Sequence, residues 1–241
     1  MGDNYPVPAP VASEVQAMFG EIATRYDLLN RLLSFGMDQR WRAVTMKEMN
    51  LQPEQEILDL CCGTGDLSLG FARQGCKVTG ADFTGPMLPL ARAKAQRANL
   101  NLRLAQADAE ALPFADGSFD AVTISFGIRN VHQPKQALKE CLRVLRPGGK
   151  LGVLEFFPMK RSLWRTLFRF YFHSILPLFA RIFRAGRGGA YRYLPASVDS
   201  FVSAENFKAW LQEIGFEQTR STPLTGAVAH LQVGVKSKPH G

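Results

Sequence analysis

The feature that most constrains the fold is the regular alternation of short apolar runs and helical segments across residues 54–157. The runs EILDLC, DLSLGFARQG and KVTGAD predict a strand, a helix and a second strand, in that order. Five further segments predict helix, strand, strand, helix and strand: GPMLPLARAKAQRAN, LNLRLAQAD, FDAVTISFG, PKQALKECLRVLRPGG and KLGVLEF. Strands that alternate with helices predict an α/β fold, in which a parallel sheet carries helices on both faces.

The flanking segments belong to the same predicted domain, residues 1–241, because a chain of this length can bury one sizeable core. Residues 13–50 have apolar side chains at helical spacing and predict an N-terminal helical cap. Residues 158–200 are basic and aromatic and predict a helical insertion, while 201–241 predict a helix and an antiparallel hairpin. The parallel sheet is therefore expected to finish with a reversed strand.

Charge and cysteine content narrow the cellular location. The formal charge of +8 and the pI of about 9.5 fit a solvated basic surface. No nucleic-acid partner is predicted, since the chain contains no basic and aromatic strand motif of a known nucleic-acid module. Four cysteines without an even framework indicate a reducing compartment. With no signal-peptide pattern at residues 1–10 and no uninterrupted apolar stretch of ~20 residues, the predicted location is the cytoplasm.

The segment DLCCGTGD, residues 59–66, places a Gly-x-Gly turn between the first predicted strand and helix. Ligands of open parallel sheets bind at the carboxyl ends of the strands, and the first such turn is the usual place. Gly63 and Gly65 are therefore candidate ligand contacts, although an ordinary tight turn would have the same pattern. A dinucleotide is disfavoured, because Ser68 replaces the third glycine and Asp66 would repel a pyrophosphate at the helix start.

Four aspartates favour a nucleoside with an amino-acid tail: three end predicted strands, and one starts the first predicted helix. Asp59 and Asp66 would suit an α-ammonium group, and Asp82 could accept hydrogen bonds from both ribose hydroxyls. Asp108 could accept one from an adenine amine. S-adenosylmethionine has all of these groups, although each aspartate alone could instead be a helix cap. No metal is predicted, because the adjacent Cys61 and Cys62 have no partners at ligand spacing.

Longer motifs extend this interpretation to nearly the whole chain. They are MFGEIATRYDLLNRLLSFGMDQRWR, LDLCCGTGDL, DAEALPFADGSFDAVTISFGIRNV, RVLRPGGKLGVLEF and AYRYLPASVDSF. From about residue 18 to residue 235, the sequence resembles the menaquinone/ubiquinone biosynthesis C-methyltransferases, the MenG/UbiE family. The resemblance implies a class I S-adenosylmethionine-dependent methyltransferase with a Rossmann-like fold and a seven-stranded, mostly parallel sheet with one antiparallel strand.

The family's cofactor contacts, carried over by position, fall on Thr64, Asp82, Asp108, Ala109 and Ser125. With the turn and strand-end residues, the predicted cofactor site comprises Asp59, Gly63, Thr64, Gly65, Asp82, Phe83, Asp108, Ala109 and Ser125. The segments DFTGPML and EFFPMKR depart from the forms common in the family, and the second departure concerns the acceptor pocket.

The methyl acceptor implied by the resemblance is a polyprenylated quinol. Methylating a ring carbon needs a carbon nucleophile, which a hydroquinone supplies when a hydroxyl loses its proton and charge reaches the ortho carbon. Arg129, in FGIRNV, is expected to face the methyl group and stabilise the phenolate, because a guanidinium cannot normally act as a base. A structural ion pair is the alternative role for this arginine. Asn130 is expected to orient a water molecule or a ring oxygen.

Other candidate catalytic residues come from outside the sheet. His173, Tyr191 and Tyr193 are candidates for proton relay, although a lone histidine in an aromatic helix is more often a core residue. Tyr26 and Asp27 are expected to close over the cofactor, with helix packing as the alternative.

The arginines of residues 159–189 alternate with Leu, Phe, Trp and Ile, which is typical of a core-packed helix or of a helix that docks on anionic lipid. The second interpretation predicts transient contact with the inner face of the membrane, where a prenyl tail is collected. The aromatic surface also leaves room for a homodimer.

The predicted function is C-methylation of demethylmenaquinol to menaquinol. Three alternatives stay open: the corresponding benzoquinol of ubiquinone biosynthesis, instead or as well; another small lipid, such as a sterol or tocopherol; and a catalytically idle scaffold in a quinone-biosynthesis assembly.

Overall fold

A computed structural model describes residues 16–20, 23, 26–159 and 190–238 of the chain. These residues form a seven-stranded sheet of order β3-β2-β1-β4-β5-β7-β6. The strands are β1 (Glu56–Leu60), β2 (Lys77–Asp82), β3 (Arg103–Gln106), β4 (Phe119–Ser125), β5 (Leu145–Phe156), β6 (Phe216–Leu224) and β7 (Ala229–Lys236). Strand β7 is antiparallel to both of its neighbours, and all other pairs are parallel. The predicted sheet, with its single reversed strand, is confirmed.

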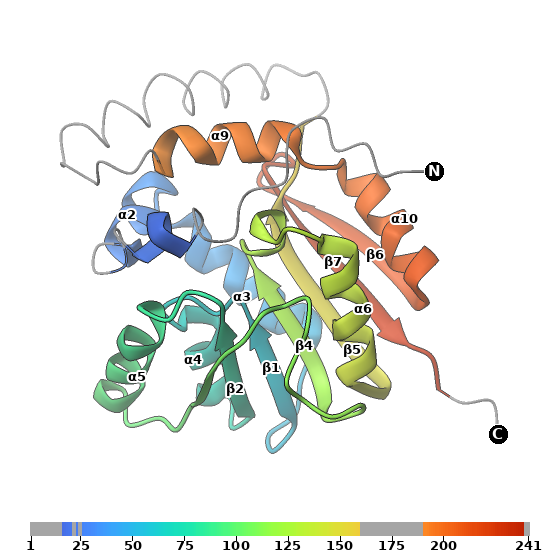
Figure 1. Cartoon of the computed structure of the whole chain (residues 1–241), viewed down its shortest axis with the longest axis horizontal. Coiled ribbons are helices and arrows are strands. Elements are labelled where there is room, and N and C mark those ends of the chain that lie inside the picture. Colours follow the sequence, from blue (N-terminus) through green and yellow to red (C-terminus); the bar gives the residue numbers. More distant parts are fainter. Residues whose placement is uncertain (1–15, 21–22, 24–25, 160–189, 239–241) are drawn as a thin grey trace.

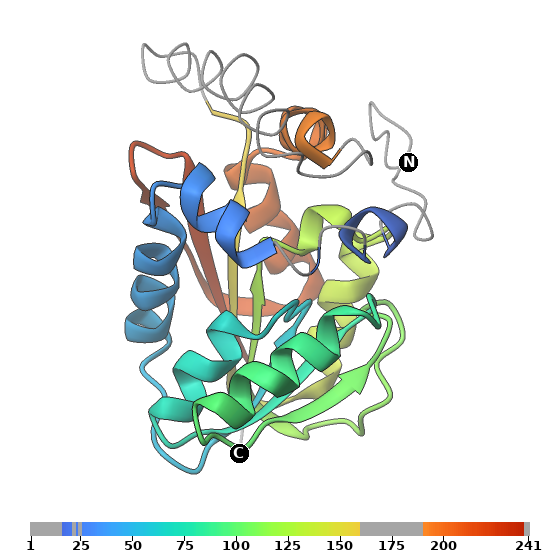
Figure 2. The ribbon, with the colours of Figure 1, turned by 90° about the vertical axis from the view of Figure 1, so that its left-hand side faces the viewer.

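Helices cover both faces of the sheet, as the alternation predicts. They are α2 (Tyr26–Leu33), α3 (Met37–Met49), α4 (Asp66–Arg73), α5 (Met87–Arg97), α6 (Pro134–Val144), α9 (Ala190–Ser200) and α10 (Ala204–Ile214). Helices α3 and α4 pack on one face, and α6 and α10 pack on the other. Figure 2 views the sheet nearly edge-on, with α3 and α6 on opposite sides of it.

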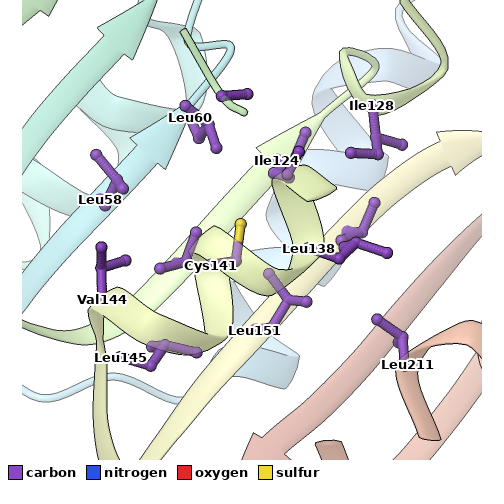
Figure 3. Packing of buried hydrophobic residues seen from close by; sticks show 14 of the residues in the cluster. Leu58, Leu60, Ile124, Ile128, Leu138, Cys141, Val144, Leu145, Leu151 and Leu211 are labelled. Carbon is purple, nitrogen blue, oxygen red and sulfur yellow. The ribbon is translucent and has the colours of Figure 1, made fainter. Parts of the chain in front are cut away.

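The strands of the sheet centre are apolar on both faces, because both are buried. In β1, Leu58 and Leu60 pack toward α6 and α10, whereas Ile57 packs toward Phe71 of α4. Figure 3 shows the first of these layers, where Leu138 of α6 lies near the central strands. Each strand thus alternates between two cores, which fixes its register.

Two predicted boundaries differ from the structure around PKQALKECLRVLRPGG. Helix α6 ends at Val144, and β5 begins at Leu145, within the segment expected to be helical. The pairing with β4 passes from Phe119 opposite Leu145 to Ala121 opposite Lys150, so the RPGG residues bulge out of register. Pairing with β4 outweighs helix propensity here, since Pro147 could not continue the helix. Strand β3 is also shorter than predicted, spanning only Arg103–Gln106.

Several N-terminal and C-terminal elements meet above the carboxyl edge of the sheet. Helices α2 and α9 lie over this edge (Figure 1), together with the 3₁₀ turn η2 (Ile128–Asn130). Farther along, Trp41 of α3 donates a hydrogen bond from Nε1 to Thr225 Oγ1 in the β6–β7 turn, at 2.9 Å. The indole also packs against Phe126 and Phe156. Helix α3 and the β6–β7 turn, which are far apart in the sequence, are therefore in direct contact.

The predicted basic insertion lies mostly outside the described residues, which resume at α9. Within the described part of the chain, no helix has the length and apolar character needed to cross a membrane.

Candidate active site

A cleft opens at the carboxyl edge of the sheet, at the ends of β1, β2 and β4. Its empty space is about 820 Å³, including open solvent at the mouth. Phe19 from the helical turn at residues 16–20 and Met87 of α5 also line it. Seven residues predicted from the sequence line the cleft: Gly63, Asp82, Phe83, Asp108, Ala109, Ser125 and Asn130.

The cleft continues into a smaller pocket, here called the narrow end. The two share Cys61, Gly63 and Ser125 in their linings. The narrow end is lined by Asp27, Arg42, Asp59, Cys61, Cys62, Gly63, Thr64, Asp66, Leu67 and Ser125. The predicted Asp59 and Thr64 therefore lie at this end, away from Asp108.

Strained backbone marks the ends of two adjacent strands. Cys61 after β1 and Phe126 after β4 have positive φ angles of 55° and 58°, which side chains other than glycine rarely adopt. Both residues line the cleft. A Cβ on the next residue, Gly127, would lie only 2.3 Å from the Cβ of Cys61. The two strand ends thus meet at a spacing that only glycine allows, and such strain is common at functional sites.

The glycine turn is shaped by Gly65 and by the carboxylate of Asp82. Gly65 has φ +82°, and a Cβ there would approach the Cβ of Ala91 to 3.2 Å. The N–H of Gly63 donates to Asp82 Oδ2, and the N–H of Thr84 donates to Asp82 Oδ1, each at 2.7 Å. Burial raises the pKa of Asp82, and these two donors oppose the shift. Asp82 thereby connects the end of β2 to the turn after β1.

The helix-cap alternative does not hold for Asp82 and Asp108, although both carboxylates accept a local backbone N–H. Asp82 and Asp108 each accept an N–H from the residue two positions later, and for Asp108 this is Glu110 at 2.9 Å. Neither aspartate starts a helix: these bonds form Asx turns, which orient the carboxylates at the cleft. A turn and a ligand contact are compatible, because each carboxylate has further lone pairs.

Ser125 has a buried side chain that fits a ligand contact. Its Oγ is buried and has no hydrogen-bond partner among the described residues. The side chain lies where the cleft and the narrow end meet. Buried hydroxyls are nearly always paired, so this oxygen fits a ligand group that occupies the junction.

Asp59 is held inside the sheet more firmly than its sequence position indicates. Its carboxylate accepts hydrogen bonds from Ser68 Oγ at 2.5 Å and from Thr123 Oγ1 at 2.9 Å. Burial raises its pKa to about 6, although both hydroxyls and the charge of Arg42 oppose the shift. Asp59 still lines the narrow end and can meet a cationic group there.

The structure corrects the predicted use of Asp66. Its carboxylate is paired with the Lys94 ammonium of α5 and accepts from Gln39 Nε2 at 3.1 Å. Lys94 also donates to Asp27 Oδ2 of α2 at 2.8 Å, and Thr64 Oγ1 donates to Asp27 Oδ1 at 2.5 Å. An internal lysine thus takes the place expected for a ligand's ammonium. The same lysine connects α2 to the glycine turn, because it also donates to Thr64 Oγ1.

Replacing Lys94 with methionine should loosen α2 from the turn. Asp27 and Asp66 would lose the cation they share, and we expect a loss of about 1–3 kcal/mol in the free energy of unfolding. Chymotryptic cleavage within residues 16–35 should become faster. Asp27→Asn in the same background should recover part of the stability, whereas the exposed Lys47→Met serves as a control. A Lys94→Met variant as stable and protease-resistant as the parent would contradict the assigned pairing.

Arg129 makes the ion pair that was the alternative in the sequence interpretation. Its guanidinium pairs with the fully buried Glu155 and donates to Phe126 O at 3.2 Å and Ser197 Oγ at 3.3 Å. It also lies 5.6 Å from the centre of the Phe156 ring. Arg129 is not among the residues that line the cleft. Its charge balances Glu155, whose carboxylate would be costly to leave unpaired. Its role toward a phenolate stays a prediction.

Asn130, unlike Arg129, reaches the cleft. Tyr193 of α9 donates from its hydroxyl to Asn130 Oδ1 at 2.9 Å. His132, which the sequence interpretation missed, also lines the cleft. Its position two residues beyond Asn130 was the only available signal.

The remaining candidates have mixed outcomes. Tyr26 is the first residue of α2, and its neighbour Asp27 lines the narrow end. His173 lies outside the described residues, and Tyr191 is in the first turn of α9.

The described residues contain no group of three or more His, Cys, Asp or Glu side chains able to hold a metal. Burial and the Asp82 carboxylate raise the pKa values of Cys61 and Cys62 well above the usual range, so both thiols stay protonated.

These features define a class of protein. The sheet order with a reversed β7, the glycine turn after β1 and the carboxylate at the end of β2 are those of the class I S-adenosylmethionine-dependent methyltransferases. The residues present fit this cofactor, because Asp82 can accept from ribose hydroxyls and the orphaned Ser125 hydroxyl meets the junction of the cleft with the narrow end. When bound, S-adenosylmethionine supplies an electrophilic methyl group.

Comparisons with known proteins agree. The model of the ubiE/COQ5 methyltransferase family matches residues 10–236. A demethylmenaquinone methyltransferase from Thermus thermophilus is 49% identical over 219 residues, which are 90% of this chain and 99% of the relative. A ubiquinone/menaquinone biosynthesis C-methyltransferase UbiE from Geobacter sp. is 44% identical, covering 92% of this chain and 96% of the relative.

A solved structure supports the fold. The chain is similar, with a TM-score of 0.64 and 18% identity, to an S-adenosylmethionine-dependent methyltransferase from Thermotoga maritima, over 92% of this chain and 99% of that one. The protein described here belongs to the ubiE/COQ5 methyltransferase family, and it is an S-adenosylmethionine-dependent methyltransferase.

Proposed function

We propose that this enzyme methylates a ring carbon of a polyprenylated hydroquinone, with demethylmenaquinol as its substrate. The observation that carries the proposal is the 49% identity, over nearly the full length of both chains, to a protein named demethylmenaquinone methyltransferase. The cleft supports it further, because Phe19, Phe83 and Phe126 add aromatic surface to the polar cofactor contacts. An aromatic ring would therefore be bound beside the methyl donor.

The reaction needs the hydroquinone form, since only a phenolate makes the ring carbon nucleophilic. This chain must hold that carbon in line with the transferred methyl group and must favour loss of the hydroxyl proton. Among the described residues that line the cleft, His132 is the one histidine, and an imidazole is the side chain that most often serves as a general base in enzymes. Its imidazole is our candidate acceptor.

Asn130 is our candidate for orienting the ring oxygen. The Tyr193 hydroxyl occupies its Oδ1 at 2.9 Å, which leaves the amide N–H₂ group to donate. Its Nδ2 lies 3.5 Å from the Phe126 carbonyl oxygen. A small rotation of the amide would therefore let this group donate a hydrogen bond to a substrate oxygen. Arg129 would act as a positioning residue. Its charge is balanced by Glu155, and its hydrogen bonds hold Phe126 and Ser197 of α9 in place beside Asn130.

Peripheral contact with the inner face of the membrane belongs to the same proposal. The prenyl tail of such a substrate stays in the lipid, so the enzyme must approach it from the cytoplasm. Support comes from α2, where Leu28 and Leu32 are 60% and 47% exposed at i, i+4 spacing, next to the exposed Arg31. Helix α2 lies at the same edge of the sheet as the cleft (Figure 1). The predicted homodimer remains a further proposal.

The test is a mass-spectrometric assay of purified protein with S-adenosylmethionine. The substrates are chemically reduced demethylmenaquinol, the demethylated benzoquinol and an unreduced quinone control. We expect one added methyl group on the naphthoquinol and none on the quinone, because the quinone offers no phenolate. A methylated quinone in the unreduced sample would contradict the mechanism.

The benzoquinol is the second candidate substrate, favoured by the name of the Geobacter relative, which covers both pathways. Methylation of both quinols would make this a dual-substrate enzyme. If neither quinol gained a methyl group while the cofactor bound, the substrate assignment would be wrong and another small lipid would take its place.

A further inference from the structure

The narrow end contains one arginine that the predicted cofactor site does not include. Arg42, near the middle of α3, is 8% exposed and is the one positively charged residue among the described residues lining this pocket. Asp27, Asp59 and Asp66 line the same pocket. Two of these carboxylates, Asp27 and Asp66, already share Lys94, which lies outside the lining.

The charges of the pocket match one part of the cofactor. The cleft proper holds the strand-end carboxylates suited to ribose and adenine, so the narrow end beyond Ser125 is left for the amino-acid end. That end is a zwitterion, with one ammonium and one carboxylate group. Asp59 can meet the ammonium, but without Arg42 the carboxylate would lie beside three acidic side chains, with no cation among the described residues of the lining. A buried carboxylate needs a cationic or hydrogen-bonding partner.

Arg42 is held in place before any ligand arrives. Its Nη1 donates to Asp38 Oδ2 at 2.9 Å and to the Asp38 carbonyl oxygen at 3.2 Å. Asp38 is itself fixed by Ser34 Oγ at 2.8 Å and Gln39 Nε2 at 2.9 Å. The guanidinium carbon lies 5.4 Å from the centre of the Phe126 ring. Because these bonds use only Nη1, the planar group keeps further donors for a carboxylate.

We propose that Arg42 binds the carboxylate of the cofactor's amino-acid end, and that Asp38 positions its guanidinium for this contact. The N-terminal helix α3 would then supply part of the cofactor site, in addition to the residues of the sheet. The proposal concerns the methyl donor only and is independent of which quinol is methylated.

Two ligands that differ only in this carboxylate test the proposal directly: S-adenosylmethionine and its decarboxylated analogue. Calorimetric titration of the full chain, without quinol, gives both dissociation constants. In Arg42→Met we expect the affinity for S-adenosylmethionine to fall about 10- to 100-fold, as for the loss of a charged hydrogen-bonding pair. The affinity for the decarboxylated analogue should change less than about threefold, because that ligand never used the contact.

Arg40→Met is the matched control, since Arg40 is an exposed arginine of the same helix and the charge change is identical. It should leave both affinities unchanged. If Arg42→Met fails to fold, Arg42→Lys replaces it and should still weaken S-adenosylmethionine selectively, by a smaller factor. Equal weakening of both ligands, or no weakening of either, would overturn the proposal, because a merely structural arginine cannot distinguish two ligands by their carboxylate.

Discussion

Replacing Arg129 with alanine is expected to lower the free energy of unfolding by about 3–5 kcal/mol, because it leaves the fully buried Glu155 carboxylate without its partner. The loss should be measured by urea denaturation. Methyl transfer should fall sharply as well, since the guanidinium also holds Phe126 O at the cleft edge and Ser197 of α9. Affinity for S-adenosylmethionine in the folded fraction should stay nearly unchanged, because Arg129 does not line the cleft.

The pH dependence of the loss in the free energy of unfolding gives an independent check of the Arg129–Glu155 pair. Burial already raises the pKa of Glu155, and the Arg129 charge opposes that shift. In Arg129→Ala the pKa of Glu155 should rise further above its unfolded value. A carboxyl whose folded pKa is raised destabilises the protein as pH increases through that pKa, so the deficit should be larger at pH 8 than at pH 5.

The double variant Arg129→Met with Glu155→Leu is the matched control. Removing both charges leaves no orphaned ion, so this variant should recover much of the stability lost by the single change. The rate of methyl transfer by this double variant then distinguishes a structural role of Arg129 from a role in stabilising the phenolate. Recovery of activity along with stability would mean a structural role, whereas a stable but inactive double variant would support the phenolate-stabilising prediction. A deficit independent of pH would contradict the assigned pair.

Asp82→Ala is expected to weaken binding of S-adenosylhomocysteine by roughly 100-fold or more. Two contributions add: the ribose hydroxyls lose a charged acceptor, and the N–H groups of Gly63 and Thr84 lose their carboxylate partner, which loosens the glycine turn. Isothermal titration calorimetry measures the affinity. Unfolding experiments should show a smaller effect, about 1–3 kcal/mol, since two backbone donors are left unpaired.

Two further variants make the Asp82 result specific. Asp82→Asn keeps an acceptor for one of the two N–H groups, so it should fold normally and still bind the ligand more weakly than the parent. Asp116→Ala removes an exposed carboxylate that pairs with Arg143 on the surface, and its affinity should match that of the parent. Unchanged affinity in Asp82→Ala would remove Asp82 from the cofactor site.

Much of the sheet was predictable because its signals are local. Apolar runs such as that of β1 are bounded by turn residues, and helices α4, α5 and α6 follow β1, β2 and β4. The positions of Asp82 and Asp108 at strand ends follow from the same boundaries. The end of α6 was not predictable in this way, because pairing with β4 draws Leu145 and the residues after it into β5.

The cofactor site was only partly predictable because some of its chemistry is assembled across the chain. Asp66 looked available to a ligand, but its partner Lys94 lies 28 residues later, in a different helix. Nothing in the sequence near Arg129 indicates that Glu155 would meet it, 26 residues away. Arg42 and His132 likewise reach the site only through the packing of α3 and the geometry of the turn after η2.

The hydrogen bond between Trp41 and Thr225 has a consequence for how the enzyme is made. The two residues are 184 positions apart, so Trp41 of α3 cannot make this contact until the ribosome has synthesised the β6–β7 turn. Central strands β1, β2 and β4 can pair earlier, while Trp41 of α3 waits for the β6–β7 hairpin. Contacts of such long sequence separation slow folding. A nascent chain stalled before residue 216 should therefore carry a formed glycine turn while α3 still lacks its contact with the β6–β7 turn, so the hairpin would complete the support of the helix that carries Arg42.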